Sequence, residues 1–231
     1  MAFAFPPAGQ ATVPVAGSTS SFPVHRIYCV GRNYVEHAKE MGDTGREPPF
    51  FFMKPADAVL PVAIGAIGEM PYPPKTIDLH HEIELVIAIG KTGRDIAPMD
   101  AAHYVWGYAV GLDMTRRDLQ GDAKKTGRPW CTGKGFDLSA PIGPIHRVQD
   151  SGWLERGAIS LAVNGAQRQT SDIGKLIWNV AETIAHLSQF FTLQPGDLIF
   201  TGTPEGVAAV QKGDLLHGAI DGLGDLQIRI V

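Results

Sequence analysis

Carboxylates and histidines alternate with apolar residues between positions 76 and 89. Asp78, His80, Glu82 and Glu84 occupy every second position, and most residues between them are leucine or isoleucine. In a strand this alternation places the four polar side chains on one face, with neighbours about 7 Å apart along the chain. Two glutamates at that spacing can converge on one metal ion. A solvent-exposed polar face has the same pattern, but here the face continues into small apolar residues, which favours the mouth of a cavity.

A third carboxylate follows a second strand-like segment, at positions 107–113. Ala109, Gly111 and Asp113 share one face of this segment, and the small residues leave room for an ion or a substrate beside the carboxylate. Asp113 also precedes a plausible first helical turn, so it is equally suited to cap a helix. Three carboxylates without a cysteine or histidine cluster indicate a hard cation, Mg²⁺ or Mn²⁺ before Zn²⁺.

Other polar residues could complete a catalytic site around such an ion. His37 and Glu40 lie three positions apart and would share one face of a short helix, where the carboxylate could orient an imidazole that takes a proton from water. A surface ion pair has the same spacing. Lys54, Gln120 and Lys134 stand in segments rich in proline or glycine and carry little information individually.

The elements that must position these residues are mainly strands. Strand-like runs occupy residues 27–30, 50–53, 76–89, 107–113 and 198–201, and a helix-like run occupies 99–105. Asn33 is placed to cap a short helix that reaches Glu40. One amphipathic helix is expected from Ile173 to Phe191, with Ser171 or Asp172 as its cap. We expect a β-rich α+β fold, because few βαβ units are evident.

Composition narrows the function classes. The 231 residues include 44% hydrophobic and 19% charged residues, as in ordinary globular proteins, and two cysteines, which favour a reduced protein over a disulfide framework. The net charge of −4 makes nucleic acid an unlikely partner. Apolar runs are too short to span a bilayer, so no membrane partner is expected and a cytoplasmic location follows by default.

The N-terminal stretch differs from the rest of the chain. Residues 1–24 are rich in alanine, proline, glycine and serine, and they lack the basic and apolar regions of a secretory signal. We expect an irregular arm over residues 1–24 and a catalytic domain over residues 25–231. Residues 42–49, which follow the expected helix, are a candidate lid, although loops of this length are often simple connections.

In the segments that contain the polar residues described above, the sequence resembles the fumarylacetoacetate hydrolase family, and more closely its compact acylpyruvate hydrolase branch. The resemblance runs from about His25 to the C-terminus. The ordered blocks that carry it are residues 31–34 with His37 and Glu40, 52–55, 81–85, 111–115, 117–118 with Gln120, 125–130 with Lys134, 164–165 and 196–207. Several blocks in the right order are far more specific than a single pair of glutamates.

The resemblance implies a β-rich, sandwich-like mixed roll of the C-terminal-domain type, assembled as a homodimer. It implies Mg²⁺ or Mn²⁺ held by Glu82, Glu84 and Asp113, and a water-activating pair formed by His37 and Glu40. The reaction implied is hydrolysis of a carbon–carbon bond in a small diketo acid of the acylpyruvate type. Fumarylpyruvate, which yields fumarate and pyruvate in gentisate breakdown, is the expected substrate.

The same resemblance assigns supporting roles to further residues. Gln120 and Lys134 would support catalysis, and the backbone around Thr201, Gly202 and Thr203 would help to hold the substrate carboxylate. Further substrate contacts are expected among three cationic residues: Arg32, Lys54 and Arg117. His80 and His81 are not assigned as metal ligands.

Two other functions use the same residues. Oxaloacetate decarboxylation and dienoate isomerisation both proceed through a metal enolate, and the three carboxylates alone do not distinguish them from hydrolysis. The pair His37 and Glu40 favours hydrolysis, because decarboxylation needs no activated water. A binding protein without catalysis would need neither the metal site nor the base.

Overall fold

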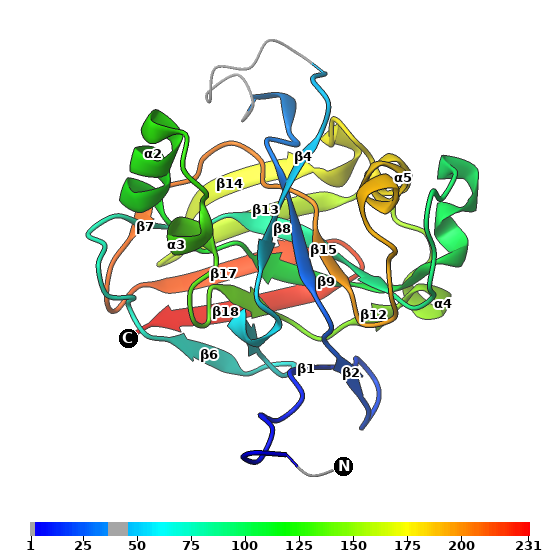
Figure 1. The fold of residues 1–231 in the computed structure, drawn as a ribbon. Coiled ribbons are helices and arrows are strands. Elements are labelled where there is room, and N and C mark those ends of the chain that lie inside the picture. Colours follow the sequence, from blue (N-terminus) through cyan, green and yellow to red (C-terminus); the bar gives the residue numbers. More distant parts are fainter. Residues whose placement is uncertain (1–2, 37–45) are drawn as a thin grey trace.

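The computed structural model describes residues 3–36 and 46–231, and two mixed β-sheets form its centre (Figure 1). The larger sheet has eight strands, with β12 paired to β9 beside the main order β4-β3-β15-β8-β9-β11-β5. Its strands are β3 (Ile27–Gly31), β4 (Phe50–Lys54), β5 (Val59–Pro61), β8 (Ile83–Ile89), β9 (Val105–Leu112), β11 (Ala140–Ile142), β12 (His146–Arg147) and β15 (Leu198–Phe200).

The second sheet has five strands in the order β14-β13-β17-β18-β6. These are β6 (Ile67–Met70), β13 (Ala158–Val163), β14 (Ala166–Asp172), β17 (Leu215–Ile220) and β18 (Gly224–Ile230). Two small sheets complete the β structure. One pairs β7 (Leu79–His80) with β10 (Thr115–Arg116) and β16 (Ala209–Val210), and the other is a hairpin of β1 (Thr12–Pro14) and β2 (Ser21–Pro23).

Short helices lie around the sheets, with α2 and α3 on one side of the view and α5 on the other (Figure 1). The α-helices are α2 (Arg117–Thr126), α3 (Cys131–Lys134), α4 (Val148–Ser151) and α5 (Val180–Phe190), and the 3₁₀ helices are η1 (Ala56–Ala58), η2 (Pro98–His103) and η3 (Ile173–Lys175). No described helix has the length and apolar character needed to cross a membrane. The expected β-rich α+β roll is confirmed.

Strand β8 lies at the centre of the larger sheet and is buried on both faces. Leu85 and Ile87 on one face belong to a core shared with the second sheet, which includes Leu161 of β13. Val86 on the opposite face packs in another core with Phe200. That second core also contains the apolar residues of the N-terminal hairpin: Val13, Val15, Phe22 and Val24. Glu84 shares the face of Val86 and therefore stands at the end of this core.

The expected irregular arm differs from the structure between residues 12 and 24. These residues form the β1–β2 hairpin, and Ile145 anchors it through backbone bonds to the chain at Pro14 and Ala16. Burial of the hairpin's valines explains why these residues form regular structure, because their apolar contact with the sheet compensates the conformational entropy lost on fixing the chain. The division into residues 1–24 and 25–231 stays a prediction.

The expected strand over residues 76–89 is broken in two. Strand β7 ends at His80 and β8 begins at Ile83, so His81 and Glu82 form the junction between a small sheet and the large one. The single alternating face therefore does not persist across the junction. The second expected strand, over 107–113, is confirmed in place but begins at Val105 and ends at Leu112, which leaves Asp113 just beyond the sheet. The helix-like run 99–105 is a 3₁₀ helix over Pro98–His103.

The amphipathic helix begins later than the sequence pattern predicts. Asp172 closes β14 and its carboxylate caps η3 by accepting from the Gly174 N–H, whereas α5 starts at Val180. Asn179 and Glu182 form a reciprocal capping box at that start. Ile173 and Leu176 are buried without being part of the helix, so their spacing reflects burial and not helical geometry.

The expected helix that Asn33 would cap extends into residues outside the described structure, and the hydrogen bonds of the Asn33 side chain to described residues lie elsewhere. Its side-chain amide donates to the carbonyl oxygens of Trp178 and Thr201 at 2.9 and 2.8 Å, and its oxygen accepts from the Trp178 N–H at 2.8 Å. Asn33 instead joins three segments that are distant in sequence. Both cysteines are free thiols, with Cys29 buried and Cys131 exposed.

Candidate metal centre and active site

Glu82, Glu84 and Asp113 come together where β8 begins and β9 ends. Each offers a carboxylate oxygen, and these oxygens lie within 4.8 Å of one another. Antiparallel pairing of β8 with β9 sets Glu84 opposite Gly111, and the Asp113 N–H donates to the Glu82 carbonyl at 2.9 Å. The three residues are only 5%, 1% and 1% exposed. The expected grouping of these three carboxylates is therefore present in the structure.

Neighbouring side chains fill the space at Gly111, so it does not hold an ion or a substrate as the sequence pattern predicted. A Cβ atom at this position would lie 2.5 Å from a Val86 methyl group and 2.8 Å from the Phe200 ring. A larger residue would therefore push β9 away from β8 and displace Asp113 from the two glutamates. Asp113 is not a helix cap, because β10 separates it from α2.

Three cationic side chains contact two of the three carboxylates, Glu82 and Asp113. The buried Lys134 ammonium donates to Glu82 at 2.8 Å, to Asp113 at 2.6 Å and to the Thr115 hydroxyl at 2.7 Å. Burial alone lowers the pKa of Lys134, but the charges of Asp113 and Glu82 outweigh burial and raise it overall. Lys134 is therefore an ammonium ion at neutral pH.

Lys54 and Arg117 provide the other two cations. Lys54 is buried, its Nζ lies 2.9 Å from Asp113 Oδ1, and it donates to the carbonyl oxygens of Met114 and Lys134. Arg117 donates to Glu82 Oε1 and, at 2.6 Å, to the side-chain oxygen of Gln120. Both cations therefore contact the carboxylate group directly, which places Lys54 beside Asp113 and not in the cavity described next.

A cavity opens beside the carboxylates. It brings together most of the residues that the sequence analysis selected: Arg32, Glu82, Glu84, Asp113, Arg117, Gln120, Lys134 and Thr203. Val30, Gly31, Phe52 and Trp130 complete its wall. A neighbouring pocket shares Gly31 and Arg32 with this cavity and continues to Phe50 and Trp178. Arg32 therefore stands between the two spaces.

The segment from Thr201 to Thr203 faces the protein more than the cavity. The Gly202 N–H donates to Glu84 Oε2 at 2.8 Å, and the Thr201 N–H and hydroxyl both donate to the Leu85 carbonyl. Of these three residues, only Thr203 lines the cavity. The donors of Thr201 and Gly202 thus hold β8 and its carboxylate, and their contact with a substrate carboxylate stays a prediction.

Several expectations fall on residues outside the described structure. His37 and Glu40, the expected water-activating pair, lie outside the described residues. The candidate lid over residues 42–49 is described only from Arg46 onward. The roles of these residues stay predictions.

Sequence reasoning missed two buried polar residues next to the carboxylates. His81 Nδ1 lies 2.9 Å from Gln169 Oε1, and the same oxygen accepts from the Ile83 N–H at 3.2 Å. Burial lowers the pKa of His81 to about 4, so its imidazole is neutral at physiological pH. His81 belongs to a block that resembles the family. Gln169 stands in a polar strand with no pattern that marks it.

The carboxylate group fits a hard divalent cation. Its donors are all carboxylate oxygens, the ligands that Mg²⁺ and Mn²⁺ prefer. Within the part of the chain that the structure describes, the buried Asp113 Oδ1 contacts the Lys54 ammonium group at 2.9 Å but accepts no hydrogen bond from it. An oxygen in that state keeps lone-pair capacity for a second cation.

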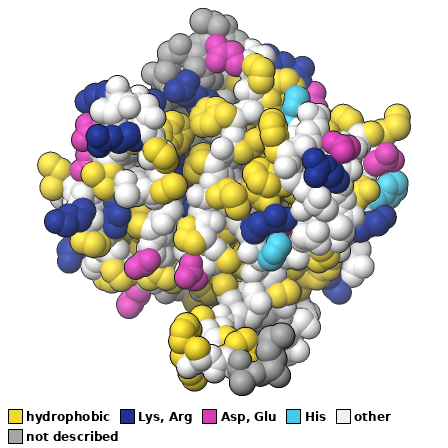
Figure 2. Space-filling view, in the orientation of Figure 1, with side chains coloured by type: hydrophobic (Ala, Val, Ile, Leu, Met, Phe, Trp, Pro, Cys, Tyr) yellow, Lys and Arg dark blue, Asp and Glu magenta, His cyan; other side chains and the backbone are white. Residues whose placement is uncertain are grey.

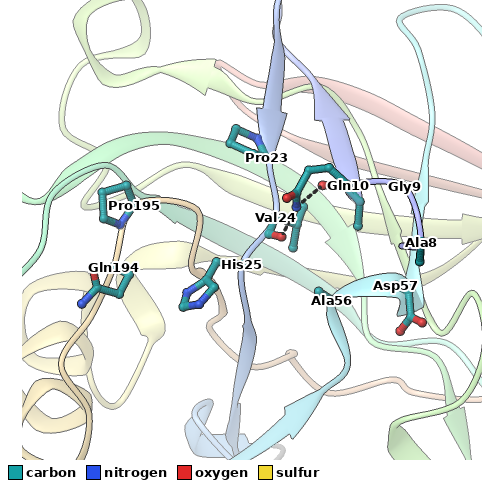
Figure 3. Close-up of a pocket in the computed structure, with 11 residues that line it drawn as sticks. Ala8, Gly9, Gln10, Pro23, Val24, His25, Ala56, Asp57, Gln194 and Pro195 are labelled. Atoms are coloured by element: carbon teal, nitrogen blue, oxygen red, sulfur yellow. Dashed lines mark hydrogen bonds between the residues drawn. The ribbon is translucent and has the colours of Figure 1, made fainter. Parts of the chain in front are cut away.

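A broader hollow lies elsewhere on the molecule, where residues 8–11 meet the β2–β3 junction and the turn at Gln194 and Pro195 (Figure 3). Gln10 donates to the Val24 carbonyl at 2.7 Å within it. His25 contributes its ring to the hollow but pairs with the buried Asp197 at 2.8 Å. With Asp57 as the only acid in its lining, this hollow lacks the grouped carboxylates of the candidate site.

Comparison with known proteins agrees with this geometry. Residues 26–231 match the family model for the fumarylacetoacetate (FAA) hydrolase C-terminal domain. A fumarylpyruvate hydrolase of a Ralstonia species is 46% identical over 188 residues, which cover 81% of this chain and 95% of that protein. An oxaloacetate tautomerase of Escherichia coli is 40% identical, with 89% and 93% of the two chains covered.

A solved structure is similar along the entire chain. It is the fumarylpyruvate hydrolase of Pseudomonas aeruginosa in complex with Mn²⁺ and pyruvate, which is 58% identical and covers 100% of this chain and 99% of its own. The TM-score between the two structures is 0.98. The chain belongs to the fumarylacetoacetate hydrolase family.

Proposed function

We propose that this protein hydrolyses fumarylpyruvate to fumarate and pyruvate, with a divalent cation held by Glu82, Glu84 and Asp113. The observation that carries the proposal is the buried group of three carboxylates at the wall of a cavity. The relatives from Pseudomonas aeruginosa and Ralstonia support the substrate, because both are named fumarylpyruvate hydrolases and the first is described with Mn²⁺ and pyruvate.

The charge balance at the site supports a doubly charged substrate. Lys54, Lys134 and Arg117 contact Glu82 and Asp113, and their three positive charges equal the charge of three ionised carboxylates. A bound divalent cation therefore adds two uncompensated positive charges, and fumarylpyruvate carries two carboxylates. When bound, the cation supplies Lewis acidity where negative charge develops on the pyruvyl group.

Proton transfer and oxyanion stabilisation fall to residues of this chain. We assign His37, oriented by Glu40, as the base that takes a proton from the attacking water. The water adds to the distal carbonyl, the carbon–carbon bond then breaks, and its electron pair passes to the pyruvyl fragment, which is protonated and released. Gln120 is better placed than Lys134 to donate to the oxyanion. The Gln120 side-chain oxygen accepts from Arg117, so the NH₂ group of Gln120 points away from Arg117. Lys134, in contrast, already donates three hydrogen bonds.

Arg32 is the strongest candidate to bind the far carboxylate of a fumaryl group. Lys54 and Arg117 contact the carboxylate group, whereas Arg32 lies between the cavity and the pocket that extends to Trp178. A substrate that reaches the metal centre with one end can present its other end to Arg32. Thr203 also lines the cavity and can contact either end.

The test is pyruvate release from fumarylpyruvate and from acetylpyruvate, which lacks the far carboxylate. We expect Mn²⁺-dependent release from fumarylpyruvate, its loss after exhaustive chelation, and its loss in Glu84→Gln. Arg32→Met should lower kcat/KM for fumarylpyruvate about 10–100-fold, as expected for a lost hydrogen-bonded charge pair, and change acetylpyruvate turnover little. A wild-type preference for acetylpyruvate would reject the fumaryl assignment and leave the acylpyruvate hydrolase mechanism in place.

A second candidate function is an oxaloacetate reaction on the same platform. The Escherichia coli relative named oxaloacetate tautomerase supports it at 40% identity. Decarboxylation of oxaloacetate, or its tautomerisation, would proceed at the same metal centre without an activated water. Rapid turnover of oxaloacetate together with no pyruvate from either acylpyruvate would favour this function over hydrolysis.

Mg²⁺ as the resident ion, a cytoplasmic location and a homodimer stay predictions. Hydrophobic side chains gather over β4 on the face shown in Figure 2, and the homodimer has support there. Phe50 and Met53 of β4, an outer strand of the larger sheet, are 38% and 40% exposed. Three positions apart, they lie on opposite faces of the strand, so a second copy would have to pack along this outer edge to remove both from water. Sedimentation of the wild type and of Met53→Glu tests the prediction.

A further inference from the structure

One glutamine of the second sheet reaches the backbone that carries the carboxylates. Gln169 lies in β14, opposite Leu161 of β13, and its side chain is fully buried. The pairing of these strands shifts by one residue, because Gln167 is opposite Ala162 and Arg168 is left over as a bulge. Without the bulge Gln167 and Gln169 would share a face. The bulge turns Gln169 inward while Gln167 stays exposed.

The orientation of the Gln169 amide follows from its partners. The Thr203 hydroxyl donates to the Ile83 carbonyl at 2.8 Å, so it can only accept from Gln169, whose Nε2 lies 2.8 Å away. Nε2 also donates to the Pro204 carbonyl at 2.8 Å. The side-chain oxygen therefore faces the other way, where it accepts from the Ile83 N–H and from His81 Nδ1.

These bonds fix both backbone polar groups of Ile83, the residue between the two glutamates. The Ile83 N–H is held by Gln169 directly, and the Ile83 carbonyl is held by Thr203, which Gln169 holds in turn. Gly202, next to Thr203, donates to Glu84. One side chain thus links the segment that carries Glu82 and Glu84 to the loop that supports Glu84.

We propose that Gln169 is a positioning residue that holds Glu82, Glu84 and the Gly202–Pro204 loop at the spacing a divalent cation requires. The inference rests on the proposed metal site but not on the substrate. Gln169 itself is not among the residues that line the cavity, so it acts through Ile83 and Thr203. Loss of such outer contacts typically costs about 10–100-fold in metal affinity.

The test is Mn²⁺ affinity of the metal-free protein, measured by titration with detection of free Mn²⁺ by electron paramagnetic resonance. We expect Gln169→Leu to weaken Mn²⁺ binding about 10–100-fold, since leucine can neither donate nor accept. Saturating Mn²⁺ should then restore much of the lost turnover, a rescue that a loss of folded protein alone would not give. Ser188→Ala is the matched control, because Ser188 is buried and bonded to Ile96 and Ala185 far from the site. It should lower stability and leave Mn²⁺ affinity unchanged.

Gln169→Asn provides a second variant for the Mn²⁺ affinity measurement if the leucine variant does not fold. Asparagine keeps the amide but is one methylene shorter, so it cannot reach Ile83 and Thr203 together, and Mn²⁺ binding should weaken again. Wild-type Mn²⁺ affinity in a folded Leu or Asn variant would overturn the proposal. The proposed function fails separately: wild-type protein that binds Mn²⁺ but releases no pyruvate would reject the activity and leave the role of Gln169 intact.

Discussion

Replacement of Lys134 by methionine should destabilise the metal-free protein strongly. Lys134 is buried, and its ammonium group donates to Glu82, Asp113 and Thr115. Methionine keeps most of the side-chain volume but removes the charge, which leaves two buried carboxylates short of a partner. Breaking a buried ion pair from one side costs about 3–5 kcal/mol. A protein of this size loses roughly 2–4 °C in Tm per kcal/mol, so we expect Tm to fall by about 6–20 °C.

Mn²⁺ should reverse part of this loss. A divalent cation between the carboxylates supplies the positive charge that the variant lacks, so Mn²⁺ should raise the Tm of Lys134→Met more than that of the wild type. Turnover should stay low, because the metal restores charge but not the position of Thr115 and its neighbours. Calorimetry of chelated and Mn²⁺-loaded protein measures both effects. Lys125→Met, at an exposed ion pair with Asp122, is the matched control and should change stability by less than about 1 kcal/mol.

Two results would refute this reasoning. A metal-free Lys134→Met protein that unfolds within about 1 kcal/mol of the wild type would show that Lys134 does not compensate buried charge. An equal rise in Tm on Mn²⁺ addition in both proteins would show that the cation and the ammonium group do not act on the same carboxylates.

Three further predictions follow from other parts of the molecule. Gly206 has a φ of +90°, and a Cβ atom there would lie 2.1 Å from the Arg168 carbonyl oxygen. Gly206→Ala should therefore lower the free energy of unfolding, measured with denaturant, by about 1–3 kcal/mol. An unchanged unfolding midpoint would refute the close packing. The pKa of His81 is lowered to about 4 in the folded protein. The stability that its neutral ring contributes is therefore complete above pH 6.5, and about 3 kcal/mol of it is lost as the pH falls toward 4. NMR titration should show a neutral His81 at pH 5.5. His37→Ala, which removes the base, should lower kcat about 10²–10⁴-fold, and Glu40→Gln should lower it as well. The kcat of the double variant should be little lower than that of His37→Ala. A loss equal to the product of the single effects would contradict a shared role.

The carboxylate site could be predicted because its signal is local. Glu82 and Glu84 are two positions apart at the start of a strand, and Asp113 follows a segment of small residues. These patterns place oxygen ligands without knowledge of the rest of the chain. The resemblance to a known family then joined the two segments, which alternation alone could not do.

The partners of these carboxylates could not be predicted in the same way. Lys54 and Lys134 are 80 residues apart, and both reach Asp113 because β4 and α3 pack against the same end of the sheet. Gln169 is directed inward by a bulge in a strand of the second sheet, which no local pattern in its polar sequence reveals. Such contacts depend on how distant strands are paired.

The helix boundary failed for a different reason. Most apolar residues from Ile173 onward recur at helical spacing because they pack into the core, but the first of them belong to a 3₁₀ turn and a loop. The true start had a local signal, since Asn179 followed by Glu182 three positions later is a capping box. Burial alone therefore predicted which side chains face the core, and the capping residues define where the helix begins.

The geometry also indicates where members of this family can differ in substrate. At the metal end, Glu82 and Asp113 contact Lys54, Lys134 and Arg117, and Gly202 donates to Glu84. A change there would disturb the charge balance on which the metal site depends. The neighbouring pocket, which runs from Arg32 to Trp178, is lined by none of the three carboxylates. Exchange of residues in this pocket between hydrolase and tautomerase relatives should therefore alter the acyl preference while metal affinity stays constant.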